Sequence, residues 1–328
     1  MNPRFAAHLD SYSALLRHLR EWFWHQDILE VDTPLLSIQG DIETHLDCLT
    51  VNRRAPRKSV EIAPDRSAPG YLVTSPEFAL KQLVAQSRRS LFQLAHSFRD
   101  GDVGGWHTEE FLMLEWYLVE SDLEALMDFC DRFFASLSVL PFVHHRFRPA
   151  VRRAIPELFR EHLGIDLQAA SLAAAAVERR LLTRQQADRY AYDDLFFLLF
   201  LNAIEPILSE IGDGQPVYVY HYPPELAAFS QVRSGWARRF EIYWRGVELA
   251  NGYEELRSRQ EYEAAFAREL HHRHRLGKPS GCVDQRWLAV LTDCDGLPFC
   301  SGIALGFERL LAILLQSDGL GAISPFAR

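Results

Sequence analysis

The sequence predicts an α+β fold in which a mostly antiparallel sheet is flanked by helices. Strand-like segments are spread between long helical stretches and do not alternate regularly with them, which disfavours a parallel sheet. Residues 91–98 and 111–119 read as neighbouring antiparallel strands joined by a glycine-rich loop. The 328 residues contain no internal repeat, low-complexity tract or Pro/Ser-rich linker. We therefore expect one domain, residues 1–328.

Hydrophobic spacing places the elements in order. Apolar residues at helical spacing predict a helix over residues 9–24. Further helices are expected over residues 78–84, over the charged stretch 261–275 and over residues 307–315. Short apolar or alternating runs predict extended segments over residues 28–34, 71–73, 91–98, 111–119, 217–220 and 240–251. Residues 121–212 are expected to form a mainly helical insertion layer, with an alanine-rich turn near residues 169–176. Ser75 suits the N-cap of the second helix and Pro76 its first position.

Composition excludes several classes of protein. The chain is 48% hydrophobic, enough for a large core, and its net charge of −9 disfavours a large nucleic-acid footprint. No secretory signal is visible at the N-terminus. The most apolar run, residues 195–208, is interrupted by Asn202, Glu205 and Pro206, and we expect no bilayer span. Cytoplasmic residence follows as the default expectation.

The cysteines and histidines do not form a recognisable metal or disulfide pattern. The sequence has 5 cysteines, which we expect to be mostly buried small side chains: Cys48, Cys130, Cys282, Cys294 and Cys300. The tract His271–His274 lies in a charged helical stretch. A solvated helix face is favoured over a metal tract there by about five to one on composition.

Two segments near opposite ends of the chain read as halves of one nucleotide site. The first carries Arg99, His107 and Phe111, and the second carries Gly306 and Arg309. The planar, permanently charged fork of arginine suits bidentate phosphate contacts. Taken singly, these residues would be ordinary core, loop or surface positions. Their order and spacing across matching segments favour a site.

A third segment, residues 239–252, adds two carboxylates that could hold the magnesium ion of a nucleotide. Glu241 and Glu248 are seven residues apart, an odd spacing that does not align two side chains on one extended strand. A turn at Arg245–Gly246 resets the register between two strands and makes a shared ion plausible.

These segments resemble the motifs of the class II aminoacyl-tRNA synthetases, and their details resemble the lysyl branch. Residues 28–34 are similar to the first, dimer-forming motif, residues 98–117 to the second and residues 302–309 to the third. The segments most specific for the lysyl branch are Thr74–Glu77, Met113–Tyr117, Arg239–Glu241 and Glu248–Tyr253. The resemblance covers nearly the whole chain and implies the class II catalytic fold.

The resemblance also implies a particular kind of synthetase. The first motif begins within about 30 residues of the N-terminus, which leaves no room for the anticodon-binding barrel of lysyl-tRNA synthetases. The chain is thus similar to the elongation factor P lysine ligases, stand-alone paralogues that attach β-lysine to a lysine of elongation factor P. The implied cofactors are ATP and Mg²⁺, and the implied assembly is a homodimer. The implied substrate is lysine or β-lysine, and tRNA is not an expected partner.

Roles follow from the resemblance, residue by residue. The implied catalytic residues are Arg99, His107 and Arg309, which contact the phosphates. The implied ATP-binding residues are Arg99, Asp102, His107, Phe111, Glu241, Asn251, Gly306 and Arg309, with Glu241 and Glu248 as metal ligands. The implied substrate-binding residues are Ser75, Glu77, Glu115, Tyr117, Asn251, Glu255 and Ala304. Glu115, Tyr117 and Glu255 match positions that recognise the side-chain ammonium.

Two departures from the lysyl pattern concern specificity. The second motif usually has a glutamate that reads adenine where this chain has Gly101, so Asp102 or backbone carbonyls would substitute. Ala304 stands where lysyl-tRNA synthetases usually carry glycine, and its methyl group would reshape the amino-acid pocket; plain packing is an equally good explanation of that methyl.

Two other functions remain open at this point. One is a free-standing lysine-activating synthetase that acts on tRNA or another amine. The other is a catalytically silent regulatory paralogue. A nucleotide-binding module of unrelated fold is disfavoured, because the sequence contains no Gly-x-x-x-x-Gly-Lys-Ser/Thr loop.

Overall fold

The computed structural model describes residues 7–40, 42–52, 69–278 and 283–323. They divide into two compact units. Unit 1 comprises Met1–Glu120 and Leu256–Arg328, and unit 2 comprises Ser121–Glu255. The interpretation of the chain as one domain stays a prediction.

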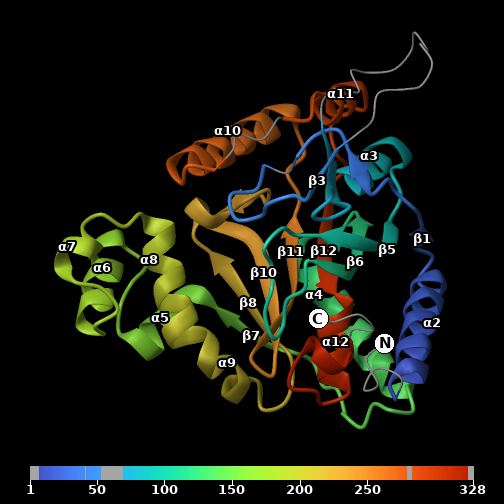
Figure 1. The fold of residues 1–328 in the computed structure, drawn as a ribbon, viewed down its shortest axis with the longest axis horizontal. Coiled ribbons are helices and arrows are strands. Elements are labelled where there is room, and N and C mark those ends of the chain that lie inside the picture. The colour runs from blue at the N-terminus through green and yellow to red at the C-terminus, as the bar shows by residue number, and fades with distance from the viewer. Residues whose placement is uncertain (1–6, 41, 53–68, 279–282, 324–328) are drawn as a thin grey trace. The chain divides into compact units, whose positions relative to one another are not determined.

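Unit 1 contains a mostly antiparallel sheet (Figure 1). Strand β5 (Leu91–Phe98) pairs with β1 (Leu29–Glu30) in parallel and with β6 (Glu110–Val119) in antiparallel fashion. On its other side β6 pairs antiparallel with β12 (Cys300–Gly306). The predicted antiparallel pair is confirmed. Strand β12 was missed, because small residues at every second position give it a weak strand signal.

The other elements of unit 1 are a small sheet and several helices. The small sheet has the order β2 (Leu36–Ser37), β4 (Gly70–Leu72), β3 (Thr50–Val51). The helices are α2 (Leu9–His25), α3 (Glu77–Ser87), α10 (Arg259–Arg275), α11 (Gln285–Asp293), α12 (Phe307–Leu314) and the 3₁₀ turn η4 (Leu320–Ala322). Helix α2 presents an apolar stripe to the sheet, where Phe23 stacks on Phe92 with 4.6 Å between ring centroids.

Helix α3 begins one residue later than the capping pattern predicts. Pro76, not Ser75, is the N-cap residue. The hydroxyl of Ser75 still accepts the backbone N–H of Glu77 at 2.9 Å, so it satisfies one of the orphan donors of the first turn. This hydrogen bond therefore fixes the position of the Ser75 hydroxyl.

Unit 2 contains four strands paired in the order β11–β10–β8–β7. Its strands are β7 (Val151–Ala154), β8 (Val217–Tyr222), β10 (Trp236–Trp244) and β11 (Val247–Glu254), with β9 (Val232–Arg233) beside β10. Only β7 and β8 run parallel among these pairs. The sequence did not predict β7, because it lies in a stretch whose long helices dominate the pattern.

Helices make up most of the first half of unit 2. They are α4 (Leu123–Ser136), η1 (Leu137–Val139), α5 (Ile155–Leu163), α6 (Ala169–Glu178), α7 (Arg184–Ala187), α8 (Tyr192–Leu199), the π-helical turn η2 (Phe200–Ile204), α9 (Glu205–Gly212) and, further on, η3 (Pro224–Leu226). Figure 1 shows α5 to α9 grouped together. The predicted alanine-rich turn is wrong, since the residues form α6, as the high helix propensity of alanine favours.

The most apolar helical stretch of unit 2 is longer than the sequence suggested. It covers Tyr192–Gly212, 21 residues with an 18-residue window whose mean hydropathy is 1.6, so by length and composition it could cross a membrane. Its inward side chains pack into the core of this unit, where Phe196 stacks on Phe159 at 5.2 Å. A core helix meets the same criteria, and the expectation that no span exists stays a prediction.

The predicted histidine tract and cysteines are only partly as expected. On α10, His271 and His274 are exposed, but Arg273 is buried. Cys130 and Cys300 are buried, whereas Cys48 and Cys294 are half-buried. Cys282 lies outside the described residues.

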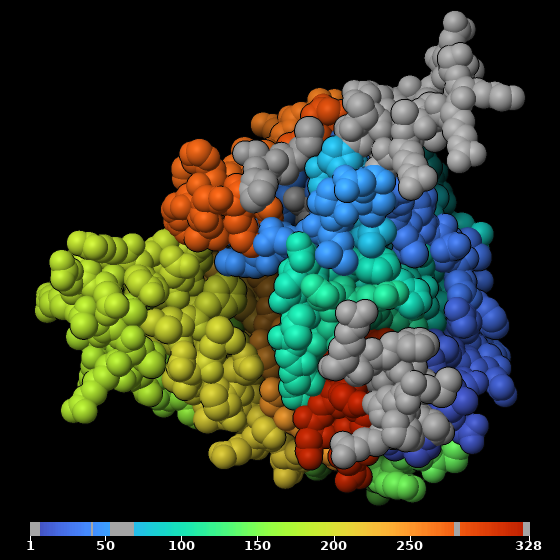
Figure 2. All heavy atoms as spheres, in the orientation of Figure 1, coloured from blue at the N-terminus to red at the C-terminus, as the bar shows by residue number. Residues whose placement is uncertain are grey.

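Arg273 ties α10 to the segment that follows β2. Its guanidinium donates to the carbonyls of Glu43 at 2.7 Å and Leu46 at 2.8 Å, and to the carboxylate of Asp47 at 3.0 Å. Figure 2 shows the blue surface of this segment against the orange surface of α10. These contacts explain why one side chain of a charged tract is only 5% exposed.

Arg273→Met should lower the free energy of unfolding by about 2–3 kcal/mol, because two backbone carbonyls and the carboxylate of Asp47 lose a charged donor whose own side chain is buried. Arg268→Met on the exposed side of α10 is the matched control and should change stability by less than about 0.5 kcal/mol. Urea unfolding of both variants measures this. Equal losses would show that the contacts of Arg273 contribute little.

Candidate active site

The pairing of β6 with β12 places small residues opposite polar ones. Across this pair Gly302 lies opposite Tyr117, Ala304 opposite Glu115 and Gly306 opposite Met113. Directly opposite residues share one face of a sheet, with Cβ atoms about 4.5–5.5 Å apart. The side chains next to these β6 residues on β12 are therefore no larger than a methyl group.

Glu115 on β6 is a buried carboxyl group. It is 2% exposed and accepts hydrogen bonds from the hydroxyls of Tyr117 at 2.7 Å and Ser75 at 2.9 Å. Burial and the nearby carboxylate of Glu77 raise the pKa of Glu115 to about 8, although both hydroxyls oppose the rise. Three predicted substrate residues thus meet here, with Ala304 directly across the strand pair.

The predicted nucleotide residues of unit 1 also come together. Burial and the positive charges of Arg309 and Arg99 lower the pKa of His107, whereas Asp102 opposes the shift, so all three charged groups lie near this imidazole. The guanidinium of Arg99 lies over the ring of Phe111 at 5.1 Å. Its buried Nε has no hydrogen-bond partner among the described residues, as expected of a group that binds an anion.

The loop between β5 and β6 is held from the C-terminal side of the chain. Gly101 stands where the lysyl pattern has a glutamate. Its φ of 79° is a conformation that glycine adopts without strain, so glycine replaces the glutamate at a turn. The backbone carbonyl of Gly105 accepts a hydrogen bond from the backbone N–H of Leu320 in η4 at 2.9 Å. The backbone carbonyl of Trp106 accepts one from the Nε–H of Arg309 at 3.0 Å. The turn η4 thus helps to position the loop that carries His107.

Glu308 was missed by the sequence analysis. Its carboxylate accepts the backbone N–H of Leu112 with both oxygens, at 3.0 and 3.2 Å, and so fixes the strand next to Phe111. Burial is the main reason that its pKa is raised to about 7. Its position beside Arg309 in the sequence was the available signal, but no pattern distinguished it from an exposed first-turn glutamate.

In unit 2 a tight hairpin and a bulge align the predicted metal ligands. Arg245 and Gly246 form the turn with φ values of 53° and 77°. Tyr243 lies opposite Glu248 and Glu241 opposite Asn251, with a register shift in between. The predicted reset at the turn is confirmed, and the bulge, which the sequence did not predict, brings Asn251 onto the same face.

Glu241 is the centre of a polar cluster in unit 2. Its carboxylate accepts the hydroxyls of Tyr222 at 2.6 Å and Tyr243 at 2.7 Å, together with a guanidinium N–H of Arg239. A carboxylate has about four acceptor positions, so one remains for another ligand. Glu241 is only 6% exposed, and this cluster holds it in one orientation.

The donor set on this face suits a hard cation. Glu248 adds a second carboxylate, and the buried side-chain oxygen of Asn251 has no hydrogen-bond partner among the described residues. Oxygen donors of this kind fit Mg²⁺. Glu255 is buried at the end of β11, bridged to Ser230. Its role beside Glu115 stays a prediction, since the two residues belong to different units.

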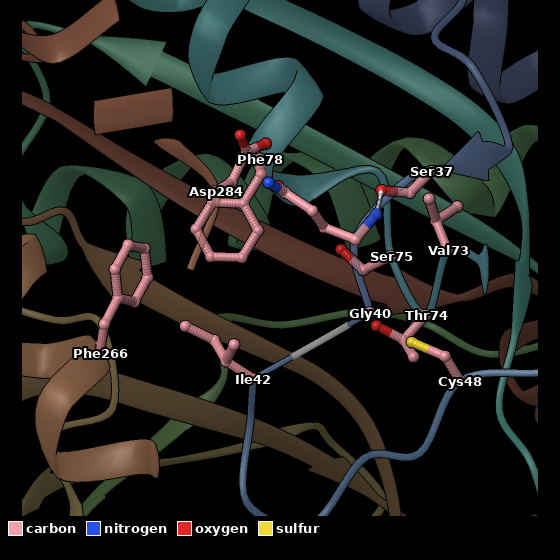
Figure 3. Close-up of a pocket in the computed structure, with 11 residues that line it drawn as sticks. Ser37, Gly40, Ile42, Cys48, Val73, Thr74, Ser75, Phe78, Phe266 and Asp284 are labelled. Atoms are coloured by element: carbon pink, nitrogen blue, oxygen red, sulfur yellow. Dashed lines mark hydrogen bonds between the residues drawn. The ribbon is translucent and has the colours of Figure 1, made fainter. Parts of the chain in front are cut away.

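A hollow opens next to Ser75 in unit 1 (Figure 3). Phe78 from α3 and Phe266 from α10 form apolar walls, and Asp284 contributes a carboxylate that already caps α11. The other lining residues are Ser37, Gln39, Gly40, Ile42, Cys48, Val73 and Thr74. Since its lining includes Ser75 but not Glu115, the hollow meets the substrate residues of unit 1 only at Ser75.

Gly319→Ala should weaken ATP binding about tenfold. A Cβ atom there would lie 2.7 Å from the carbonyl oxygen of Gly105 and displace the loop that carries His107. Gly321→Ala, where an added Cβ meets nothing within 4 Å, is the matched control and should bind ATP as the wild type does. Calorimetric titration with ATP measures both. Equal affinities would show that η4 does not position the loop.

Glu308→Gln should change how stability depends on pH. The folded-state pKa of about 7 exceeds the unfolded value of 4.5, so the wild type loses stability as pH rises through this window. Gln still accepts an N–H but does not ionise, so the variant should gain up to about 3 kcal/mol relative to wild type between pH 4.5 and pH 8. Denaturant unfolding at both pH values measures this. The exposed Glu120→Gln is the control, and a Glu308→Gln difference independent of pH would contradict the assignment.

Comparisons with known proteins agree with the geometry. A family model described as "tRNA synthetases class II (D, K and N)" matches residues 1–328. The chain is 33% identical over 320 residues to the "Elongation factor P--(R)-beta-lysine ligase" of Avibacterium paragallinarum, covering 97% of this chain and 94% of the relative. Proteins with the same name from Pasteurella multocida (strain Pm70), 33% identical over 315 residues, and Hamiltonella defensa subsp. Acyrthosiphon pisum (strain 5AT), 32% over 320 residues, each match over 95% of this chain and 92% of the relative. The chain therefore belongs to the class II tRNA synthetase family of the D, K and N type.

Proposed function

We propose that this protein is an ATP-dependent ligase that activates (R)-β-lysine, or lysine, as an aminoacyl-adenylate and transfers it to elongation factor P. The acceptor is the ε-amino group of a lysine of that factor. The observation that carries the proposal is the buried Glu115, held by two hydroxyls opposite a strand of small residues. The names of the relatives support the choice of amino acid and acceptor.

The pocket chemistry supports a diamino acid as the substrate. A buried ammonium group needs a carboxylate and further acceptors, because its desolvation is otherwise costly. Glu115 supplies that carboxylate, and Tyr117 and Ser75 hold it in one orientation. In this proposal Glu255 adds a second carboxylate, and Glu77 and Asn251 bind the reacting end of the amino acid. The methyl of Ala304 lies across from Glu115 and narrows the space, which favours an amino acid with a displaced amino group.

The residues of unit 1 support the adenylation step. A carboxylate oxygen of the amino acid forms a bond to the α-phosphorus of ATP while the bond to the bridging oxygen breaks, and pyrophosphate leaves. Arg99 neutralises charge on the α-phosphate, and His107 and Arg309 hold the γ-phosphate. The amine of the acceptor then attacks the carbonyl carbon, loses a proton, and AMP leaves. Positioning and charge neutralisation suffice, so no protein nucleophile is required.

The metal ligands support the use of Mg-ATP. Glu241, Glu248 and Asn251 would hold a magnesium ion, which neutralises phosphate charge when it is bound. Arg239, Tyr222 and Tyr243 keep the Glu241 carboxylate oriented toward this face.

The same proposal includes a homodimer in the cytoplasm. Exposed large apolar side chains occur around the first motif, including Trp24 at 52%, Leu29 at 37% and Leu36 at 47%. Such side chains near one another along the chain are typical of a surface that another subunit covers.

Purified protein with Mg-ATP should catalyse pyrophosphate exchange that depends on the amino acid, with (R)-β-lysine preferred over L-lysine. Added elongation factor P should gain the mass of one β-lysyl group on a lysine. Arg99→Ala should lower exchange at least about a hundredfold, because it removes charge neutralisation at the reacting phosphate. Radiolabelled exchange and intact-protein mass spectrometry measure these outcomes.

Other outcomes of the same assay favour the alternatives. Exchange that tRNA stimulates, without any mass gain on elongation factor P, would indicate a free-standing lysine-activating synthetase. Absence of exchange with either amino acid, in protein that still unfolds cooperatively, would indicate a silent regulatory paralogue.

A further inference from the structure

Lys81 on α3 is a fully buried cation that the proposed chemistry does not use. Its side chain is 0% exposed, and its Nζ lies 2.5 Å from a carboxylate oxygen of Glu77, one helical turn earlier. The rings of Tyr262, Phe78 and Tyr117 have their centroids 5.5, 5.9 and 6.0 Å from Nζ. An ammonium in such a setting is costly to bury and is retained only with compensation.

Lys81 lies within electrostatic reach of the proposed ammonium site. Its charge favours ionisation of Glu115, whereas the charge of Glu77 opposes it. Tyr117 links Glu115 and Lys81, since its hydroxyl donates a hydrogen bond to Glu115 and its ring lies near the ammonium group of Lys81. Among the described residues of unit 1, the charged and titratable groups that act on Glu115 are therefore Glu77, Lys81 and Tyr117.

The balance of charges among Glu77, Glu115 and Lys81 indicates a role for Lys81. Glu77 and Glu115 together would carry two negative charges in a buried space, and Lys81 carries one positive charge. With one substrate ammonium added, the charges of these groups cancel. Without Lys81 the two carboxylates would repel each other more strongly, and Glu115 would retain its proton when the substrate ammonium arrives.

We propose that Lys81 is a positioning residue of the amino-acid pocket, which fixes the carboxylate of Glu77 and offsets its charge so that Glu115 ionises when a diamino acid binds. This inference rests on the proposed function. A simple packing role is less consistent with the contacts, since an apolar side chain of the same length would fill this space without the cost of burying a charge.

The test is the pH dependence of (R)-β-lysine binding in Lys81→Met, measured by calorimetry without ATP between pH 6 and 9. In the wild type the affinity should rise with pH and level off near pH 8, because Glu115 must lose its proton to bind the ammonium. Loss of the cation should move this midpoint up by about one unit and weaken binding at pH 7 about tenfold. Binding of ATP should be unchanged, which also shows that the variant is folded.

A second variant should move the midpoint in the opposite direction. Glu77→Gln removes the charge that opposes ionisation of Glu115, so its midpoint should fall even though overall affinity also drops. Arg259→Met breaks the exposed i,i+4 ion pair with Glu263 on α10 and is the matched control, which should leave the midpoint in place. The two variants should shift the midpoint in opposite directions. If Lys81→Met does not fold, Glu77→Gln still tests whether the charge next to Lys81 controls the ionisation of Glu115.

Two results would overturn the inference in different ways. Unchanged midpoints in Lys81→Met and Glu77→Gln, with normal binding by the wild type, would reduce Lys81 to a structural residue and leave the proposed function intact. Failure of the wild type to bind either β-lysine or lysine would contradict the proposed function and this inference with it.

Discussion

The proposed chemistry depends on one buried carboxyl group, Glu115. Water is excluded from it, so its proton is held more tightly than in an exposed glutamate, and only hydroxyls and a neighbouring cation oppose this. A ligand that brings a positive charge is the partner that lowers the cost of ionising it. In the proposed function this group would therefore favour an ammonium, since a neutral side chain of similar size brings no charge that offsets the cost of ionising it.

Strand geometry sets the surroundings of this group and of the predicted metal ligands. On β12, glycine and alanine lie opposite β6 at every second position, so the neighbour directly across from Glu115 is the small residue Ala304. In unit 2 the hairpin turn and the bulge bring two carboxylates and the amide of Asn251 to one face. Glu308 and the turn η4 add backbone contacts that fix the nucleotide residues in unit 1. Strand pairing and backbone hydrogen bonds thus hold the predicted site residues in place.

Much of this arrangement could be predicted from the sequence, and the remainder has physical reasons. Glu115 and Tyr117 are two residues apart on a strand, so their shared face follows from alternation. The partner of Glu115 on β12 could not be found this way, because register depends on pairing between segments far apart in the chain. The bulge that brings Asn251 onto the face of Glu241 has no local sequence pattern that predicts it. The same is true of the burial of Lys81. An i,i+4 Glu–Lys pair such as Glu77–Lys81 reads as an ordinary exposed helix pair until the packing around it is known.

The most direct measurement is the number of protons released when the free protein binds (R)-β-lysine at pH 7, obtained by calorimetry in buffers of different ionisation enthalpy. With the pKa of Glu115 at about 8, we expect release of about 0.9 proton per site. An analogue that lacks the distal amino group should release none. Binding of β-lysine without proton release would show that Glu115 is not the group that receives the ammonium, and would contradict the account.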